Sequence, residues 1–409
     1  MVSRSARPFD LIVFGATSFV GKILCDYLVE RHGTDGDLSW AIAGRSSAKL
    51  EEVAAAGANV PRIVADAGSL DDMTELAESC RLVISTVGPY AIYGSELIAA
   101  VAAAGTDYVD LTGEPQWMQR MIDNHALQAE QSGARIVHTC GFDSIPSDLG
   151  VWFTQRQALE RFGQSCSQIA MRVKAMKGGA SGGTVASLLN VVDESKANPE
   201  LRKTLGNPYA LAPDGMRSGP KQPEVVMPKQ DKASGEWVAP FVMAGINTKV
   251  VHRSHALLDR PWGDDFLYDE AMLMGSGPMG AVKAGGLAGG LGGFMGLVTI
   301  GPIRSALDRV LPKPGEGPSP EAQVAGFFDL RFYGTTASGD TITTKVTGDR
   351  DPGYGSTAKM LAESATTLLS INRGEKTGKP GGFWTPSTAM GGRLVDALVE
   401  HAGLTFEVL

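Results

Sequence analysis

The sequence predicts an α/β chain: a doubly wound parallel sheet, followed by a second domain of α+β type. Two observations support this prediction. Short apolar runs alternate with helical patterns through the first 150 residues, as in successive βαβ units. Later in the chain, two strand patterns are joined by a tight turn, which indicates antiparallel pairing. Right-handed crossovers then fix the order of the parallel strands.

The first domain is expected to contain six strands, each an apolar run. These runs are residues 11–14, 39–43, 62–65, 82–87, 108–111 and 135–139. Helical spacing or helix-forming composition predicts the helices between them. These cover residues 20–28, 48–56, 95–104 and 117–132, with a further helix capped by Ser69. This domain is expected to span residues 1–150.

The second domain is predicted to span residues 151–350. It should contain a strand at 168–176, a helix at 184–196 and a hairpin made of 327–333 and 341–347. Residues 198–240 are rich in Pro, Gly and charge, which indicates a long surface excursion. A helix at 356–369 opens the last segment, 351–409, which is expected to return and pack on the first domain.

Composition excludes several classes of protein. Among 409 residues, 43% are hydrophobic and 20% charged, with a formal net charge of −8. This is ordinary globular composition, and the acidic balance argues against a nucleic-acid partner. The four cysteines form no Cys-x-x-Cys pair, so buried, reduced thiols in a cytoplasmic protein are expected. No export segment is recognised. No cluster has metal-ligand spacing, so no metal is predicted.

The segment Gly15-Ala-Thr-Ser-Phe-Val-Gly21 links the first strand to the first helix. Gly15 allows a sharp turn and Gly21 allows the helix to lie close to the strand, while the helix start offers free N–H groups to a pyrophosphate. This context predicts a Rossmann dinucleotide site. Its binding residues would include Thr17, Ser18, Phe19 and Val20, although Ser18 stands where many such loops have glycine.

The end of the second strand predicts the choice of coenzyme. An NAD enzyme usually has Asp or Glu there, whereas this chain has Arg45-Ser46-Ser47 and then Lys49. Because a guanidinium suits a 2′-phosphate, we expect NADP(H), bound by Arg45, Ser46 and Lys49. Asp66 could bond the adenine or cap a turn. Val87, Gly88 and Pro89, which end the fourth strand, are expected to border the nicotinamide ribose.

Three residues at the carboxyl edge of the sheet are candidate catalytic groups: Tyr90, Asp143 and Ser144. Tyr90 could donate a proton, or it could be an aromatic side chain packed over the coenzyme. Asp143 could instead cap the following helix. Asp110 and Glu114, after the fifth strand, lie at the same edge. The Tyr-x-x-x-Lys signature of short-chain dehydrogenases is absent, so no diagnostic dyad identifies the proton donor.

Residues 271–303 form an apolar tract rich in Gly and Met. Its only charge is Lys283. Glycine weakens a helix and adds little apolar surface, so a membrane span is the least favoured interpretation. The tract could be close-packed or face a second copy in a homodimer. It could also form a mobile wall of an apolar pocket, or make a peripheral contact with lipid.

Several segments together resemble those of the saccharopine dehydrogenase-like oxidoreductases, in particular the mycobacterial trans-acting enoyl reductases. They are residues 15–21, 43–45, 85–90, 108–114, 141–150 and 384–390. The resemblance implies a Rossmann domain and an α/β domain completed by the C-terminus. It also implies NADPH-dependent reduction of a carbon–carbon double bond in a polyketide or lipid intermediate, whose acyl chain is held by a separate polyketide synthase.

Two other functions remain open from the residues alone. A saccharopine-type reductase would act on an amino-acid conjugate and would need arginines that converge on carboxylates. A non-catalytic NADP-binding partner of a lipid-synthesis complex would explain why no obvious acid is visible. Turnover with an enoyl thioester separates the first function from both.

Overall fold

The chain divides into two compact units in a computed structural model that describes residues 6–179, 182–298, 316–372 and 379–409. The first unit comprises Met1–Ile145, Pro314–Gly317 and Gly353–Ala402, and the second comprises Pro146–Lys313, Pro318–Pro352 and Gly403–Leu409. The chain first passes from one unit to the other after Ile145, five residues before the domain boundary expected at residue 150.

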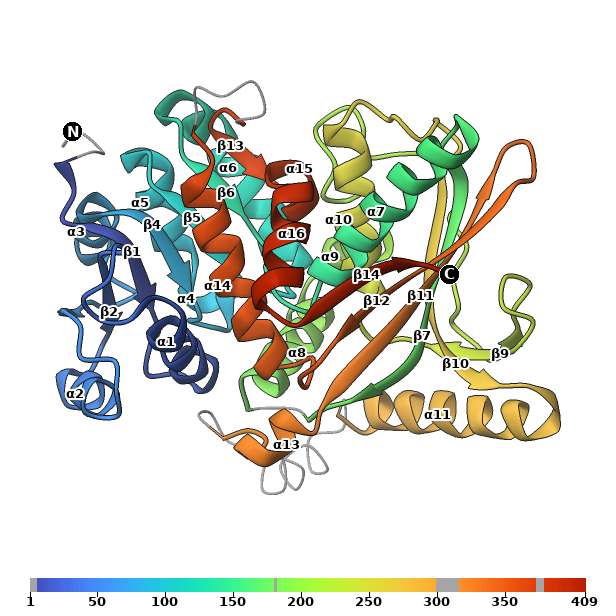
Figure 1. Ribbon diagram of the computed structural model, residues 1–409, viewed down its shortest axis with the longest axis horizontal. Coiled ribbons are helices and arrows are strands. Elements are labelled where there is room, and N and C mark those ends of the chain that lie inside the picture. Colours follow the sequence, from blue (N-terminus) through green and yellow to red (C-terminus); the bar gives the residue numbers. More distant parts are fainter. Residues whose placement is uncertain (1–5, 180–181, 299–315, 373–378) are drawn as a thin grey trace. The chain divides into compact units, whose positions relative to one another are not determined.

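The first unit contains a seven-stranded sheet whose strand pairs are all parallel. This confirms the predicted doubly wound sheet (Figure 1). In spatial order the strands are β13 (Gly382–Trp384), β6 (Arg135–Val137), β5 (Asp107–Asp110), β4 (Cys80–Ser85), β1 (Phe9–Phe14), β2 (Trp40–Gly44) and β3 (Arg62–Val64).

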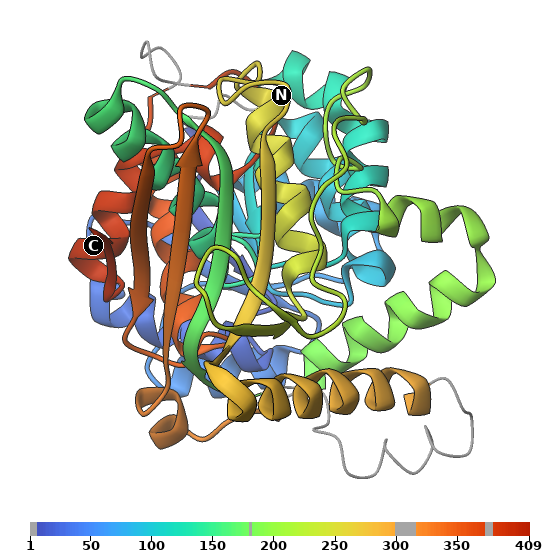
Figure 2. The same ribbon diagram turned by 90° about the vertical axis from the view of Figure 1, so that its right-hand side faces the viewer.

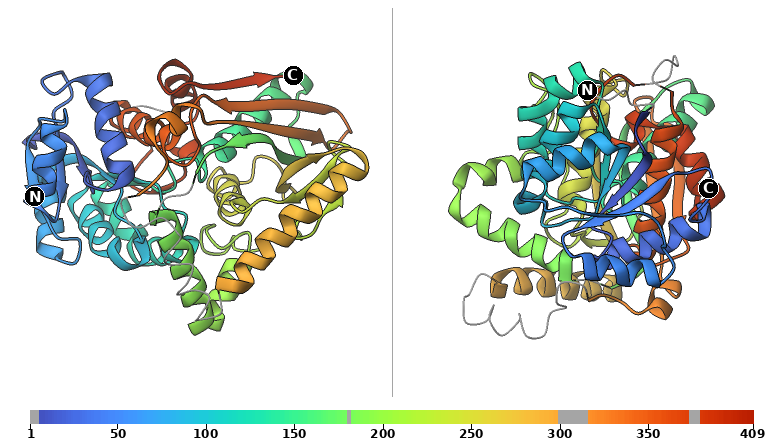
Figure 3. Two further views of the ribbon diagram at one scale, coloured as in Figure 1. Left: turned by 90° about the horizontal axis from the view of Figure 1, so that it is seen from below. Right: turned by 90° about the vertical axis from the view of Figure 1, so that its left-hand side faces the viewer.

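Helices cover both faces of this sheet, as the right-hand view in Figure 3 shows. One layer contains α3 (Leu70–Ser79), α5 (Ser95–Ala104) and α6 (Pro115–Ser132), which pack side by side. The other contains α1 (Phe19–His32), α14 (Gly355–Ser370) and α16 (Gly392–His401). Because both faces are covered, even β2, next to the edge strand β3, is buried along its whole length. The short helices α2 (Ser47–Ala55), α4 (Tyr90–Tyr93) and α15 (Pro386–Ala389) complete the unit.

The C-terminal segment is built into the first unit by buried polar contacts. Arg135 pairs with Asp107 and also donates to the carbonyls of Leu368 and Ile371 at 2.8 and 2.9 Å. Tyr27 on α1 donates to Glu363 on α14 at 2.8 Å. The C-terminal segment belongs to the first unit only as far as Ala402, because the residues after it form an edge strand of the second sheet.

The second unit has a mixed seven-stranded sheet, seen with its strands side by side in Figure 2. Its order is β14 (Leu404–Val408), β12 (Thr341–Gly348), β11 (Phe327–Thr336), β7 (Cys166–Lys177), β10 (Leu267–Gly275), β9 (Trp237–Pro240) and β8 (Lys229–Gln230). The predicted hairpin is β11–β12. The helices are α7 (Ile145–Phe162), α8 (Gly182–Ala197), α9 (Pro199–Gly206), α10 (Ala244–Leu257), α11 (Gly277–Val298) and α13 (Pro320–Val324).

The prediction of a surface excursion over 198–240 holds only in part, because residues 207–228 contain no helix or strand but the two ends of the segment do. The segment contains α9 and two strands of the sheet, and Leu211 and Val238 are fully buried. Its Pro, Gly and charged residues lie between these buried positions. The composition of the segment therefore did not indicate the short apolar stretches that are buried.

The Gly/Met tract begins in β10 and continues as α11, while residues 299–303 lie outside the described residues. The glycines of α11 are not closely packed against other described residues of the chain. A Cβ placed at Gly285, Gly289 or Gly293 would meet no atom within 4 Å. Met279 and Val282 are exposed, whereas Ala284 is fully buried. The helix therefore packs on β9 and β10, and none of the described residues covers its apolar, glycine-rich face.

Candidate coenzyme and active site

The first βα turn has the shape that a pyrophosphate site requires. Gly15 adopts φ +93°, and a Cβ there would lie 2.6 Å from Thr86 Oγ1 and 2.8 Å from a methyl group of Val87. Only glycine fits this close approach of the turn to the end of β4. A Cβ at Gly21 would collide with the Gly15 carbonyl oxygen, so both glycines are required by geometry.

Ser18 caps α1 and replaces the middle glycine of many such loops. Its Oγ accepts from the Gly21 N–H at 2.9 Å and lies 3.0 Å from Thr86 Oγ1. Thr86 in turn donates to the Gly15 carbonyl at 2.9 Å. The first N–H groups of a helix have no partner inside the helix. Ser18 satisfies that of Gly21, and the amides of Phe19 and Val20 remain at the positive end of α1, where a diphosphate would bind.

Arg45 lies at the end of β2, where a 2′-phosphate of NADP would be bound. It is exposed, and its guanidinium carbon lies 6.0 Å from the ring centroid of Tyr93. Ser46 caps α2 by accepting from the Lys49 N–H at 3.3 Å. The cap fixes the backbone that carries Arg45 and leaves its planar, charged side chain facing solvent.

The other predicted coenzyme residues also lie where strands end. Gly88-Pro89 is a cis peptide after β4, and Val87 packs near Gly15. Asp66 accepts from the Gly68 N–H at 3.0 Å. That bond gives Asp66 a role in the turn, and its contact with adenine stays a prediction. All of these residues belong to the first unit.

Tyr90 lies at the same edge but directs its hydroxyl inward. The hydroxyl donates to the Ser85 carbonyl at 2.9 Å, and the side chain is 3% exposed. Burial, together with the charge of Asp110, raises the pKa of Tyr90 well above its usual value. The Glu114 carboxylate accepts from the N–H groups of Tyr90 and Ala91, each at 2.9 Å. This geometry favours a packing and positioning role for Tyr90 over proton donation.

Asp110 is the centre of a buried network at the end of β5. Its Oδ1 accepts from the N–H groups of Thr112 and Thr139 at 3.1 and 3.0 Å, and its Oδ2 lies 2.6 Å from His138 Nδ1. Thr139 adopts φ +61°, a conformation that non-glycine residues rarely take. The network therefore holds the loop after β6, on which Asp143 lies.

Asp143 is partly buried beside Gly113, where an added Cβ would lie 3.3 Å from its Oδ2. Burial raises the pKa of Asp143 to about 7, and the charge of Asp110 contributes to the rise. A carboxyl group with this pKa is substantially protonated at neutral pH and can donate a proton. Ser144 is fully buried and donates to the Asp143 carbonyl at 2.6 Å.

Sequence reasoning did not identify the structural roles of Thr86 and His138. Thr86 ties the glycine turn to β4, and its position at the end of the most apolar strand was the available signal. His138 stood alone in the sequence, yet it pairs with Asp110 across 28 residues and packs against Trp117 at a ring distance of 5.1 Å. Only the fold could bring these two residues together.

Comparison with known proteins places this geometry in a family. A model of the saccharopine dehydrogenase NADP-binding domain matches residues 11–137. A protein of Mycobacterium tuberculosis named as a trans-acting enoyl reductase is 38% identical over 99% of each chain. The chain belongs to the family of the trans-acting enoyl reductases, with an NADP-binding domain of the saccharopine dehydrogenase type. Another trans-acting enoyl reductase, from Mycobacterium ulcerans, is 36% identical over 98% of this chain and 97% of the relative.

Saccharopine dehydrogenase from Saccharomyces cerevisiae has the same fold. Its TM-score is 0.54 at 13% identity, over 98% of this chain and 100% of the yeast chain. These comparisons confirm the α/β fold, the NADP(H) coenzyme and the class of NADP-dependent oxidoreductase. The glycine turn, the open amides of α1 and the exposed Arg45 fit that coenzyme. No described helix is long and apolar enough to cross a membrane.

Proposed function

We propose that this oxidoreductase reduces the carbon–carbon double bond of an enoyl intermediate in polyketide or lipid synthesis. Its relatives are named for enoyl reduction. The observation that carries the chemistry is Asp143, a carboxyl group with a pKa near 7 at the edge where the coenzyme turn lies. NADPH, when bound, supplies a hydride to the β-carbon. The protein must then hold the substrate and deliver a proton to the α-carbon.

Asp143 is the proposed proton donor. Its carboxyl group is protonated in a large fraction of molecules at neutral pH, and it is partly exposed, so a substrate can reach it. Tyr90 and Ser144, our other catalytic candidates, already donate to backbone carbonyls. We assign them positioning roles: Tyr90 shapes the loop after β4, and Ser144 fixes the backbone of Asp143.

A saccharopine-type substrate gains no support from the three buried arginines Arg135, Arg172 and Arg253. The buried side chains of Arg135 and Arg172 are paired with aspartates, and that of Arg253 donates to the Leu211 carbonyl. Recognition of a dicarboxylate would require arginines that point at the substrate.

The substrate chain is proposed to be held by a separate polyketide synthase, as the term trans-acting in the relatives' names implies. The uncovered face of α11 could serve a contact with that partner, with lipid or with a second copy. A homodimer and a peripheral lipid contact through this face of α11 are therefore predictions still to be tested.

Substitution of Asp143 tests the proposed chemistry directly. Asp143→Asn keeps the size of the side chain and removes its acidic proton. Single-turnover oxidation of NADPH with an enoyl thioester should slow by about 100- to 10,000-fold, the usual contribution of a general acid. Ser144→Ala, the matched control on the next residue, should retain activity to within about tenfold, because its hydroxyl already donates to the Asp143 carbonyl and carries no acidic proton.

The affinity of both variants for NADPH should be unchanged, since neither side chain belongs to the proposed coenzyme residues. An Asp143→Asn enzyme that turns over at the wild-type rate would remove Asp143 from the mechanism. Turnover of a saccharopine precursor, with none of the enoyl thioester, would overturn the proposed substrate.

A further inference from the structure

Tyr93 presents a partly exposed aromatic ring at the edge of the sheet where the coenzyme turn lies. Its side chain is 39% exposed, and that of the preceding residue, Ile92, is 57% exposed. Both residues belong to the short helix α4, which follows the end of β4. An aromatic ring exposed at such an edge is a candidate for contact with a ring of the ligand. Neither side chain is among the coenzyme residues expected from the sequence.

The backbone of α4 is held by buried contacts, so the position of Tyr93 is fixed. The Glu114 carboxylate accepts from two N–H groups of this helix, each at 2.9 Å. The N–H of Tyr93 itself donates to the Pro89 carbonyl at 3.1 Å. Directly after the helix, a Cβ at Gly94 would lie 2.5 Å from the Trp117 ring. The tyrosine therefore stands on a tightly packed support.

The end of β2, which carries Arg45, lies on the other side of the coenzyme turn. In the sheet, β1 stands between β4 and β2. A Cβ at Gly44 would lie 3.8 Å from Thr17 Oγ1, and a Cβ at Gly15 would lie 2.8 Å from a methyl group of Val87. The turn after β1 is therefore flanked by the end of β2 on one side and by the chain that leads to α4 on the other.

Arg45 reaches across this turn to Tyr93. Its guanidinium carbon lies 6.0 Å from the centroid of the tyrosine ring. Among the residues that the structure describes, no carboxylate forms an ion pair with Arg45. A cation–π contact at an exposed site is weak and changes an equilibrium constant by about two- to fivefold. The guanidinium can therefore leave the ring for a stronger partner, such as a phosphate.

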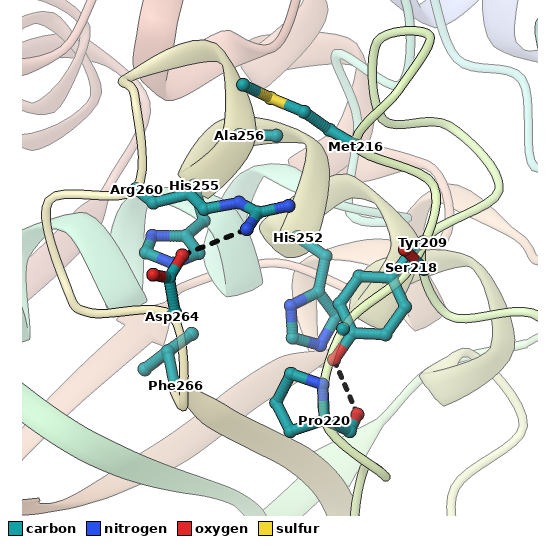
Figure 4. Close-up of a pocket in the computed structure, with 11 residues that line it drawn as sticks. Tyr209, Met216, Ser218, Pro220, His252, His255, Ala256, Arg260, Asp264 and Phe266 are labelled. Carbon is teal, nitrogen blue, oxygen red and sulfur yellow. Dashed lines mark hydrogen bonds and ion pairs between the residues drawn. The ribbon is translucent and has the colours of Figure 1, made fainter.

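Tyr209, in the second unit, is covered by a fixed neighbour instead. Its ring lies against His252 at a ring distance of 4.7 Å, and its hydroxyl donates to the Pro220 carbonyl at 2.7 Å (Figure 4). The cavity beside these residues holds about 20 Å³, which is room for one water-sized group. That ring offers no face to a ligand of coenzyme size, whereas Arg45, which lies over Tyr93, is itself exposed and can move aside.

We propose that Tyr93 binds the adenine ring of NADP(H), and that coenzyme binding moves Arg45 from the tyrosine ring to the 2′-phosphate. The exchange is favourable, because a nucleobase stacked on an aromatic ring contributes more than an exposed cation–π contact. Arg45 gains charge-assisted hydrogen bonds to the 2′-phosphate, which NADH lacks. Tyr93 therefore contributes affinity for both coenzymes, and Arg45 contributes the selectivity. The proposal depends on the coenzyme and not on the proposed substrate.

Calorimetry with adenosine 2′,5′-bisphosphate tests the contact, because this fragment contains adenine and the 2′-phosphate but no nicotinamide. Tyr93→Leu should bind the fragment about 5- to 100-fold more weakly than the wild type, the usual effect of removing a stacked aromatic ring. Tyr93→Phe keeps the ring and should bind within about twofold of the wild type.

Leu127→Ala is the matched control. Leu127 is also exposed, but it lies in the second half of α6, which returns the chain to the opposite edge of the sheet before β6. This variant should bind the fragment as the wild type does. Unchanged binding to Tyr93→Leu would overturn the proposal, as would an equal loss in Tyr93→Phe or in Leu127→Ala.

A loss of affinity for NADPH without a loss for the fragment would place Tyr93 at the nicotinamide half of the coenzyme, and this outcome would also overturn the proposal. Each of these measurements is made without turnover, so the proposed reductase activity is judged separately.

A double-mutant cycle tests the exchange itself. Each single variant, Arg45→Ala or Tyr93→Leu, loses one contact with NADPH but also loses the competing contact between the two side chains. The double variant should therefore bind NADPH about two- to fivefold more weakly than the product of the two single losses gives. A loss equal to that product would show two independent contacts and overturn the exchange.

Discussion

At the scale of single residues, Asp110 and Asp143 are two carboxyl groups whose charges interact. Asp110 contributes to the raised pKa of Asp143. Asp110→Asn removes this charge while keeping an acceptor for the amides of Thr112 and Thr139, so the pKa of Asp143 should fall from about 7. The proposed general acid acts when protonated, so the activity that declines as pH rises through 7 in the wild type should decline at lower pH in the variant.

The pH dependence of the single-turnover rate measures this shift. Glu130→Gln is the control, since it removes an exposed carboxylate from α6 and leaves the Asp110 network unchanged. A profile for Asp110→Asn that overlays the wild type would show that Asp110 does not set the proton donor's pKa.

Arg45 is predicted to select NADPH over NADH. Arg45→Ala should weaken NADPH binding by about 10- to 100-fold, the worth of a charge-assisted hydrogen bond, and leave NADH binding nearly unchanged. Arg62→Ala is the control, because Arg62 pairs with Glu51 at 3.1 Å and is not among the proposed coenzyme residues. Fluorescence titration with both coenzymes gives the ratio of the two affinities. An equal loss of affinity for NADH would contradict the assignment of Arg45 to the 2′-phosphate.

The coenzyme residues could be predicted from the sequence because they follow one another within a short turn. Gly15, Ser18 and Gly21 act through contacts over three to six positions, and Arg45 follows the next strand. The acid network could not be predicted. Asp110 and His138 meet only because β5 and β6 are neighbours in the sheet, and the sequence holds no local sign of that pairing.

At the scale of elements, α11 provides a test of how its glycines are used. Gly285→Ala with Gly289→Ala should raise the free energy of unfolding by about 1–2 kcal/mol, because alanine favours a helix and the new methyl groups meet no neighbour. Gly280→Ala in the same helix should destabilise, since its Cβ would collide with the Gly275 carbonyl oxygen. Chemical denaturation compares the three proteins. Destabilisation by the two alanines would contradict this expectation and show that a neighbour packs on that face.

The same elements show what sequence patterns could not predict. Six strands of the parallel sheet follow the apolar runs that predict them, whereas the seventh, β13, has only three residues and no such run predicts it. Helix α10 was not found, because it buries Asn247, Lys249, His252 and Arg253 along with its apolar residues. Apolar spacing does not identify a helix whose buried positions are polar.

At the scale of the whole molecule, Arg135 joins distant parts of the first unit. It pairs with Asp107 and donates to the carbonyls that end α14, more than 230 residues away in the sequence. Arg135→Ala leaves a buried carboxylate without its cation and should destabilise the protein by about 3–5 kcal/mol. Arg81→Ala removes the partly exposed pair with Asp10 and should cost about 1 kcal/mol. Thermal unfolding compares the two, and similar losses would contradict this role for Arg135.

The central claim is NADPH-dependent reduction of a carbon–carbon double bond, and isotope transfer tests it most directly. The purified protein is incubated with an enoyl thioester and NADPH deuterated at C4 of the nicotinamide, on the face from which the hydride is transferred. Mass spectrometry of the product should locate deuterium at the β-carbon and a solvent proton at the α-carbon. A saturated product without deuterium, or an unchanged double bond in the presence of tightly bound NADPH, would contradict the account.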